Sequence, residues 1–375
     1  MKVPYFVPWI TQKDKSSVLR ALTQRWLTNG HMLQKFEQGF QKYVGSRYSL
    51  GVSNGTHALH LCLASLGIGP SDEVIVPTFT FAATANVIIY CGAKPVLVDV
   101  DPKTCNILSS EIKRKRTKRT KAVIVVHYGG QPCDMEDIMT LSKKYGLYVI
   151  EDCAHALGAT YRNMRCGNIG HAGCFSFYPT KIITTGEGGM ITTSSLKVFR
   201  NSRSLRSHGI STYPQYRETK GQWRYDIEQV GYNYRLDEMR AALGLSQLKR
   251  IDRINNLRIK IAEKYNKKLE NIKGITMPSK KNDRSHIYHL YTIQIEDEYH
   301  LTRDELFQNL HRNGVGSSMQ YYPLHLMSYN KKEYKNKIEE FPNANMLKDR
   351  VLSLPIFPTM TSKQVDIVVS ALNSV

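Results

Sequence analysis

A lysine and an aspartate in the middle of the chain have the types and settings that carbonyl chemistry needs. Lys181 ends the segment Cys174–Lys181, and the glycine-rich run Gly186–Gly189 follows it. Asp152 comes directly after the strand-like run Leu147–Glu151. The aldehyde of pyridoxal 5′-phosphate (PLP) needs a lysine amine for a Schiff base, and its pyridine nitrogen needs a carboxylate to stay protonated. We predict that both residues are catalytic, although either alone would also fit a surface lysine or a helix cap.

Five further segments, taken with the lysine loop, carry a resemblance to a known family. They are Val52–Leu59, Val76–Asn86, Glu151–Ala156, Gly231–Arg235 and Ser353–Pro355. The six motifs follow one another in family order over nearly the whole chain. The chain thus resembles the DegT/DnrJ/EryC1/StrS family of PLP-dependent nucleotide-sugar aminotransferases. The resemblance implies PLP as the cofactor and the fold-type I (aspartate-aminotransferase-like) architecture.

The motif Ser53–His57 lies between an expected strand and a helix rich in Ala and Leu. Free amides at a helix N-terminus bind phosphate, and glycine lets the anion approach closely. We predict that Gly55 and Thr56 bind the cofactor phosphate and that Ser176 donates a second hydrogen bond; a glycine turn with a threonine cap is the alternative. The resemblance implies that Asn233 reaches the same phosphate in a neighbouring subunit, hence a homodimer with composite active sites.

The resemblance also implies contacts with the cofactor ring. Phe81 would stack on the pyridine face and His155 would hydrogen-bond near the phenolic oxygen, although each could instead be a packed core residue. Lys181 would hold the cofactor and then move a proton, for which its amine must be neutral. Desolvation and a cationic neighbour favour the neutral amine. Glu187 could touch substrate or simply belong to the turn.

Length and composition indicate a globular enzyme. At 375 residues and 42.8 kDa the chain can bury a large core in two domains. No stretch approaches eighteen consecutive apolar residues, which argues against a membrane span. The N-terminus does not resemble a secretory signal. The seven cysteines show no paired spacing, which favours reduced thiols in a cytoplasm over a disulfide framework or a metal site.

The net charge of +20 is unusual and leaves two interpretations open. The densest basic run, Lys113–Lys121, could be a solvated helix end or a site for a polyanion such as nucleic acid. No aromatic residue interrupts the run, which weakens the case for single-strand binding by stacking. A basic surface would also steer a diphosphate-bearing sugar toward its site.

Strand-like and helix-like segments alternate through the first two-thirds of the chain. The expected strands are Tyr48–Val52, Glu73–Val76, Pro95–Val98, Ala122–Val126, Leu147–Ile150, Cys174–Phe177 and Met190–Thr193. This alternation, with nearly continuous apolar strands, predicts an α/β fold with a mainly parallel sheet covered on both faces. We expect a large PLP-binding domain over residues 21–250, a smaller α+β domain over 251–375, and a segment 1–20 that packs with the smaller domain.

Two later segments carry more specific expectations. A long helical stretch without proline runs from Asp237 to Leu269, and Gly316–Tyr322 is strand-like. The chain also departs from the usual family pattern, since Ser71 replaces a common glycine and His171 a common aspartate. Both lie outside the positions that carry chemistry.

The sequence therefore predicts a PLP-dependent aminotransferase that aminates a nucleotide-linked keto-deoxysugar with L-glutamate, for surface-glycan or amino-sugar biosynthesis. Alternatives are a PLP-dependent sugar dehydratase of the same family, which has histidine where Lys181 stands, and a basic nucleic-acid-binding or regulatory protein. The nucleotide, the sugar and the choice of C3 or C4 stay open. Plausible sugar-nucleotide contacts are Thr28–Gly30, Arg206–Gly209 and Tyr322–His325.

Overall fold

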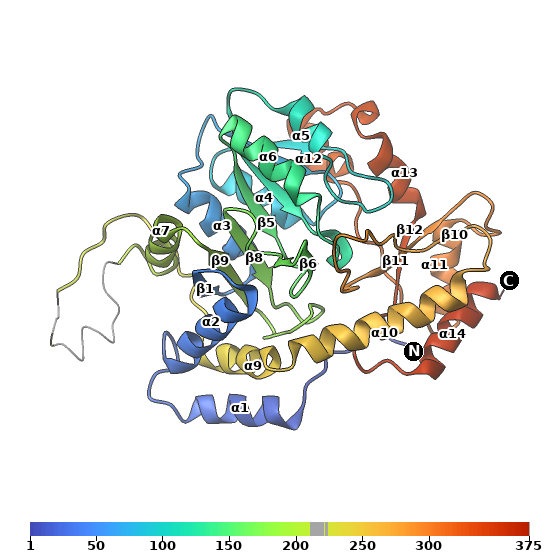
Figure 1. Cartoon of the computed structure of the whole chain (residues 1–375), viewed down its shortest axis with the longest axis horizontal. Coiled ribbons are helices and arrows are strands. Elements are labelled where there is room, and N and C mark those ends of the chain that lie inside the picture. The colour runs from blue at the N-terminus through green and yellow to red at the C-terminus, as the bar shows by residue number, and fades with distance from the viewer. Residues whose placement is uncertain (211–220, 222–223, 375) are drawn as a thin grey trace.

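A seven-stranded sheet forms the centre of the molecule, with helices packed against it (Figure 1). The structure is a computed structural model that describes residues 1–210, 221 and 224–374. In spatial order the strands are β1 (Tyr48–Val52), β9 (Gly189–Thr193), β8 (Ala172–Ser176), β5 (Tyr148–Asp152), β4 (Thr120–Val126), β2 (Glu73–Pro77) and β3 (Lys94–Val98). Only β9 runs against its neighbours within this sheet. All seven expected strands are confirmed, each end within two residues.

The sheet is covered on both faces because its strands are apolar on both faces. Val74 and Val76 of β2 belong to one core, and the intervening Ile75 belongs to another. Helices α3 (Gly55–Ser65) and α4 (Ala82–Tyr90) pack into the first core, and α5 (Ser109–Lys115) and α6 (Met135–Tyr145) into the second. A third core joins α2 (His31–Val44) to β8 and β9. Helix α7 (Leu196–Arg206) packs on α3 and β1. The mainly parallel α/β architecture is therefore confirmed.

The last third of the chain adds a small antiparallel sheet with its own apolar core. Its strand order is β10 (Ile275–Thr276), β11 (Tyr291–Ile295) and β12 (Val351–Leu354). The surrounding helices are α11 (Arg303–Arg312), α12 (Ser328–Tyr334), α13 (Pro342–Arg350) and α14 (Ser362–Asn373). The sequence did not indicate β10, β12 or the two-residue pair β6 (Thr160–Tyr161) and β7 (Met164–Arg165), which are too short to show a period.

Two expectations about secondary structure were wrong. The stretch Asp237–Leu269 is two helices, α9 (Glu238–Leu248) and α10 (Ile251–Leu269), because Arg250 leaves the helical conformation. The guanidinium of Arg250 lies 4.5 Å from the Trp9 ring centre and donates to the Trp9 carbonyl at 2.8 Å. A contact with a distant segment therefore accompanies the break.

The segment 316–322 is not a strand. Gly316 donates its N–H to the carbonyl of Val3, and Ser318 exchanges two backbone hydrogen bonds with Ser353. The segment thus divides its backbone bonds between two partners instead of forming a continuous ladder. This irregular course carries Tyr321 away from the small sheet, to a position described below.

The N-terminal segment contacts both parts of the molecule. Lys2 and Val3 donate to the carbonyl of Gly314, and Val3 belongs to the core of the small sheet. Helix α1 (Gln12–Leu22), in contrast, packs on α9. The division at residues 20 and 250 stays a prediction. Among the described residues, no helix combines the length and apolar character needed to cross a membrane.

Candidate functional site

A cavity of about 490 Å³ lies at the carboxyl ends of β2, β4, β5 and β8, where parallel sheets commonly bind ligands. Seven of the predicted site residues line it: Gly55, Thr56, Phe81, Asp152, His155, Ser176 and Lys181. Glu187 also lines it. The opposite wall comes from the N-terminal segment and the last third of the chain, through Tyr5, His289, Gln320, Tyr321 and Ile356.

Asp152 is the last residue of β5 and is held in one orientation. One carboxylate oxygen, Oδ1, accepts a hydrogen bond from the N–H of Ala154 at 3.1 Å. The other, Oδ2, accepts one from the hydroxyl of Thr84 at 3.1 Å. Burial raises the pKa of Asp152, while the Ala154 amide and the cation of Lys181 oppose that shift. A cationic ligand group in the cavity would therefore stabilise the carboxylate.

Lys181 lies on the loop between β8 and β9. The loop is tied down by backbone bonds from Lys181 N–H to the Tyr178 carbonyl and from Thr185 N–H to the Phe177 carbonyl, both 2.9 Å long. Burial lowers the pKa of Lys181 to about 8, and the nearby Asp152 opposes the shift. The amine is therefore neutral in a much larger fraction of molecules near pH 8 than an exposed lysine would be, which matches the requirement set out from the sequence.

The N-terminus of α3 forms another part of the cavity. Asn54 caps the helix, its side-chain oxygen accepting from the N–H of His57 at 2.8 Å. The first amides of a helix have no intrahelical partner and can bind an anion. A Cβ on Gly55 would lie 2.8 Å from the Cβ of Ser176. Glycine is therefore needed for Ser176 to lie beside these amides, as a shared phosphate site requires.

Two rings complete the cavity. Phe81 precedes α4 and is 60% exposed, so a flat apolar surface is left open to a ligand. His155 is buried, and its Nε2 lies 3.0 Å from the hydroxyl of Tyr321. Burial, together with the Lys181 cation, holds the pKa of His155 well below its usual value, so the ring is neutral. Thr84 and Tyr321 were not singled out from the sequence, because their roles depend on contacts between distant segments.

Asn233 does not line the cavity. It is exposed, and its backbone pairs with Ser207. Its neighbours Tyr232 and Tyr234 stack at 4.9 Å between ring centres, and Tyr234 in turn stacks on His57 at 3.5 Å. A role for Asn233 at a phosphate would therefore need a second subunit. The three segments considered for sugar-nucleotide contacts, 28–30, 206–209 and 322–325, also lie outside the residues that line the cavity.

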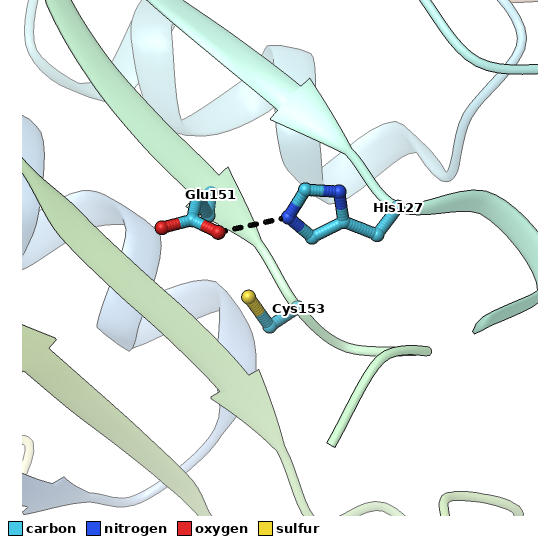
Figure 2. Close-up of side chains that lie close together, drawn as sticks. All are labelled: His127, Glu151 and Cys153. Carbon is cyan, nitrogen blue, oxygen red and sulfur yellow. Dashed lines mark hydrogen bonds and ion pairs between the residues drawn. The ribbon is translucent and has the colours of Figure 1, made fainter. Parts of the chain in front are cut away.

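Glu151, which precedes Asp152 on β5, belongs to a buried cluster with His127 and Cys153 (Figure 2). Their potential ligand atoms lie within 4.8 Å of one another. However, His127 Nδ1 accepts from the Cys133 N–H at 3.1 Å, so its Nε2 carries the proton and donates to Glu151 at 3.0 Å. Burial also keeps the Cys153 thiol protonated by raising its pKa.

The carboxylate of Glu151 is occupied as well. It accepts hydrogen bonds from the N–H groups of Gly167, Ile169 and Gly170 at 2.7–2.8 Å. Hydrogen bonds therefore account for this cluster, which fastens β5 to the turn before β8. It holds the strand that ends in Asp152.

Three of the seven basic residues in the run 113–121 pair with neighbouring acids. Arg114 pairs with Glu111 at 2.5 Å, Arg119 pairs with Glu73 at 2.7 Å, and Lys115 contacts Glu340. These pairs favour a solvated helix end over a polyanion site.

The residues of the cavity fit PLP. A helix N-terminus with a serine beside it suits the phosphate, and a fixed carboxylate suits the ring nitrogen. A neutral lysine suits the aldehyde, and an open phenylalanine face suits the ring. His155 offers one nitrogen, Nδ1, that is buried and without a hydrogen-bond partner in the described part of the chain.

Comparison with known proteins agrees with this geometry. A profile of the DegT/DnrJ/EryC1/StrS aminotransferase family matches residues 8–373. The spore coat polysaccharide biosynthesis protein SpsC of Bacillus subtilis is 40% identical, over 100% of this chain and 97% of its own. GDP-perosamine synthase of Caulobacter vibrioides is 36% identical, over 100% of this chain and 98% of its own. The solved structure of an aminotransferase from Psychrobacter cryohalolentis matches with a TM-score of 0.92 at 32% identity, over 99% of this chain and 98% of that one.

These matches span nearly the whole chain, and the TM-score of 0.92 shows that the solved structure shares its fold. The aminotransferases of this family depend on PLP. The chain therefore belongs to the DegT/DnrJ/EryC1/StrS family and is a PLP-dependent sugar aminotransferase of fold type I.

Proposed function

We propose that the enzyme aminates a keto group on a nucleotide-linked deoxysugar, with L-glutamate as the amino donor and 2-oxoglutarate as the second product. The observation that carries the proposal is a single cavity holding a lysine of lowered pKa, a fixed carboxylate and an open helix N-terminus. Relatives named for GDP-perosamine synthesis and for spore coat polysaccharide support a nucleotide sugar and a glycan product.

Each predicted site residue has a role in this proposal. Gly55, Thr56 and Ser176 hold the cofactor phosphate, and Asp152 keeps the ring nitrogen protonated. Phe81 covers one face of the ring, and His155 donates a hydrogen bond near its phenolic oxygen. When bound, PLP supplies an electron sink that stabilises negative charge on the carbon next to the substrate nitrogen.

Lys181 then has two tasks. Its neutral amine attaches the cofactor, and after a substrate amine has displaced it, its Nζ removes a proton from the carbon that bears that amine. In the second half-reaction it returns a proton to the sugar carbon that becomes aminated. Because the lowered pKa leaves much of the amine neutral at pH 8, Lys181 can act as a base without first losing a proton to solvent.

The remaining parts of the proposal concern the assembly and its surroundings. Asn233 is exposed and outside its own cavity, which supports a homodimer in which it serves the partner's phosphate. The net charge of +20 would attract the diphosphate of a sugar nucleotide. All seven cysteines are free, which supports a reducing cytoplasm.

A panel assay tests the substrate directly. PLP-loaded enzyme is incubated with L-glutamate and 4-keto or 3-keto sugars linked to GDP, UDP or dTDP, and the amino sugar and 2-oxoglutarate are measured together. We expect equal amounts of both products with at least one member, and none with Lys181→Ala. Turnover of a keto sugar without 2-oxoglutarate would contradict the donor, and inactivity with the whole panel would contradict the substrate class.

A further inference from the structure

Tyr321 enters the cavity from the irregular segment 316–322 and contacts a cofactor-binding residue. Its hydroxyl lies 3.0 Å from Nε2 of His155, and the two rings are nearly parallel, with 11° between their planes. On another side, its ring lies 6.1 Å from that of Phe81. Tyr321 thus lies beside two of the residues that are expected to contact the cofactor ring.

Hydrogen bonds on both sides hold the segment that carries Tyr321. Tyr128 donates its hydroxyl to the carbonyl of Gln320, and Tyr5 donates to the side-chain oxygen of Gln320 at 2.8 Å. Ser318 is paired with Ser353 through the backbone. The position of Tyr321 beside His155 therefore depends on Tyr5, Tyr128 and Ser353, which lie in three separate segments of the chain.

The protonation of this pair follows from its surroundings. Burial raises the pKa of Tyr321, so its phenol keeps the proton. His155 is neutral, and the groups that face it are the His289 ring at 4.4 Å, the amine of Lys181 and the ring of Tyr128. A neutral imidazole has one N–H and one acceptor nitrogen. A phenol is the better donor of the two, and an imidazole nitrogen the better acceptor.

We propose that Tyr321 is a positioning residue that acts through His155. By donating to Nε2, its hydroxyl fixes the imidazole proton on Nδ1, the nitrogen without a partner in the described residues. The Nδ1–H then donates a hydrogen bond to the anionic phenolic oxygen of PLP. This inference rests on the role of His155 in the proposed function. It adds that the hydroxyl of Tyr321 sets the tautomer of the His155 imidazole.

Nitrogen NMR of the cofactor-free protein tests the tautomer without any catalysis. In protein labelled with ¹⁵N-histidine, the His155 signals are assigned by their loss in His155→Gln. We expect the proton on Nδ1 in the wild type and a mixture or reversal in Tyr321→Phe. A wild-type proton on Nε2, or an unchanged tautomer in Tyr321→Phe, would overturn the proposal.

The absorbance of bound cofactor gives a second test. Loss of the donor to the phenolic oxygen should raise the apparent pKa of the bound-cofactor absorbance by about one unit in Tyr321→Phe. Tyr128→Phe is the matched control, because it removes a hydroxyl that bonds to Gln320 rather than to His155 and keeps the ring that faces His155. Equal shifts in the two variants would show a merely structural role. Since the NMR test needs neither substrate nor donor, its result stands whether or not the panel assay finds the sugar.

Discussion

Lys181 shows at the scale of one residue how burial prepares an amine for chemistry. Its pKa is lowered to about 8 by desolvation, while Asp152 acts in the opposite direction. The neutral, reactive form therefore increases as pH rises through about 8. We expect the initial rate of PLP attachment, followed by borohydride trapping, to rise over this range.

In Asp152→Asn the midpoint of this pH dependence of PLP attachment should move to lower pH. The substitution removes the carboxylate that stabilises the ammonium form of Lys181. Peptide mapping should place the trapped group on Lys181, and Lys181→Ala should trap none. Modification of a different lysine would contradict the assignment.

Asp152 also supports turnover. The Asp152→Asn substitution keeps the shape but removes the charge that holds the ring nitrogen protonated. A charge-assisted hydrogen bond contributes about 1.5–3 kcal/mol, which corresponds to a loss of roughly one to two decades in kcat or more. Steady-state assays at saturating PLP measure this loss. Turnover equal to the wild type would mean that another acid holds the nitrogen.

The site residues that could be predicted from the sequence are those whose neighbours along the chain form part of the same motif. Gly55 and Thr56 could be predicted because an Ala- and Leu-rich helix follows them directly in the sequence. Asp152 could be predicted because it ends an apolar strand. Thr84 lies within the motif Val76–Asn86, but its partner Asp152 belongs to another motif, and Tyr321 lies in no motif, so the roles of these two residues could not be assigned in this way. The hydrogen bond from Thr84 spans 68 positions and that from Tyr321 spans 166, and no local pattern records such a contact.

At the scale of elements, the seven central strands were predictable because burial on both faces demands continuous apolar runs. The segment 316–322, Gly-Ser-Ser-Met-Gln-Tyr-Tyr, has no continuous apolar run and forms no strand. Its backbone hydrogen bonds go to Val3 and Ser353 separately. The break between α9 and α10 was missed for a related reason. It coincides with contacts between Arg250 and Trp9, which lie 241 positions apart.

The backbone of the turn between α3 and β2 is strained at one residue, Ser71. Ser71, which replaces a common family glycine, has a φ of 73° and is exposed. Side chains with a Cβ are disfavoured in this left-handed region, and glycine is not. We expect Ser71→Gly to raise the free energy of unfolding by about 0.5–1 kcal/mol, once the extra entropy of glycine in the unfolded chain is subtracted. Urea denaturation measures the change. Ser71→Ala is the control and should give no gain, because it keeps the Cβ.

At the scale of the whole molecule, the exposed position of Asn233 predicts complementation between subunits. Asn233→Asp should repel the partner's phosphate, and Lys181→Ala removes the attaching amine, so neither variant should be active alone. In a mixed dimer, one site combines the intact Lys181 of one subunit with the intact Asn233 of the other. With random exchange of equal amounts, about a quarter of wild-type activity should return. Proven exchange without recovery, or full activity in a monomer by light scattering, would rule out the composite site.

The cavity wall in which Tyr5 bonds to Gln320 also affects when the site can form during protein synthesis. Their hydrogen bond spans 315 positions, and at a synthesis rate of 5–20 residues per second the two partners leave the ribosome about 15 to 60 s apart. Lys181 and the central sheet emerge well before Tyr321 and Ile356. During that interval the growing chain contains Lys181, but the cavity still lacks the wall formed by Tyr321 and Ile356. We therefore expect the cofactor to be captured late in the biosynthesis of this enzyme, once residues 320–356 have closed the pocket.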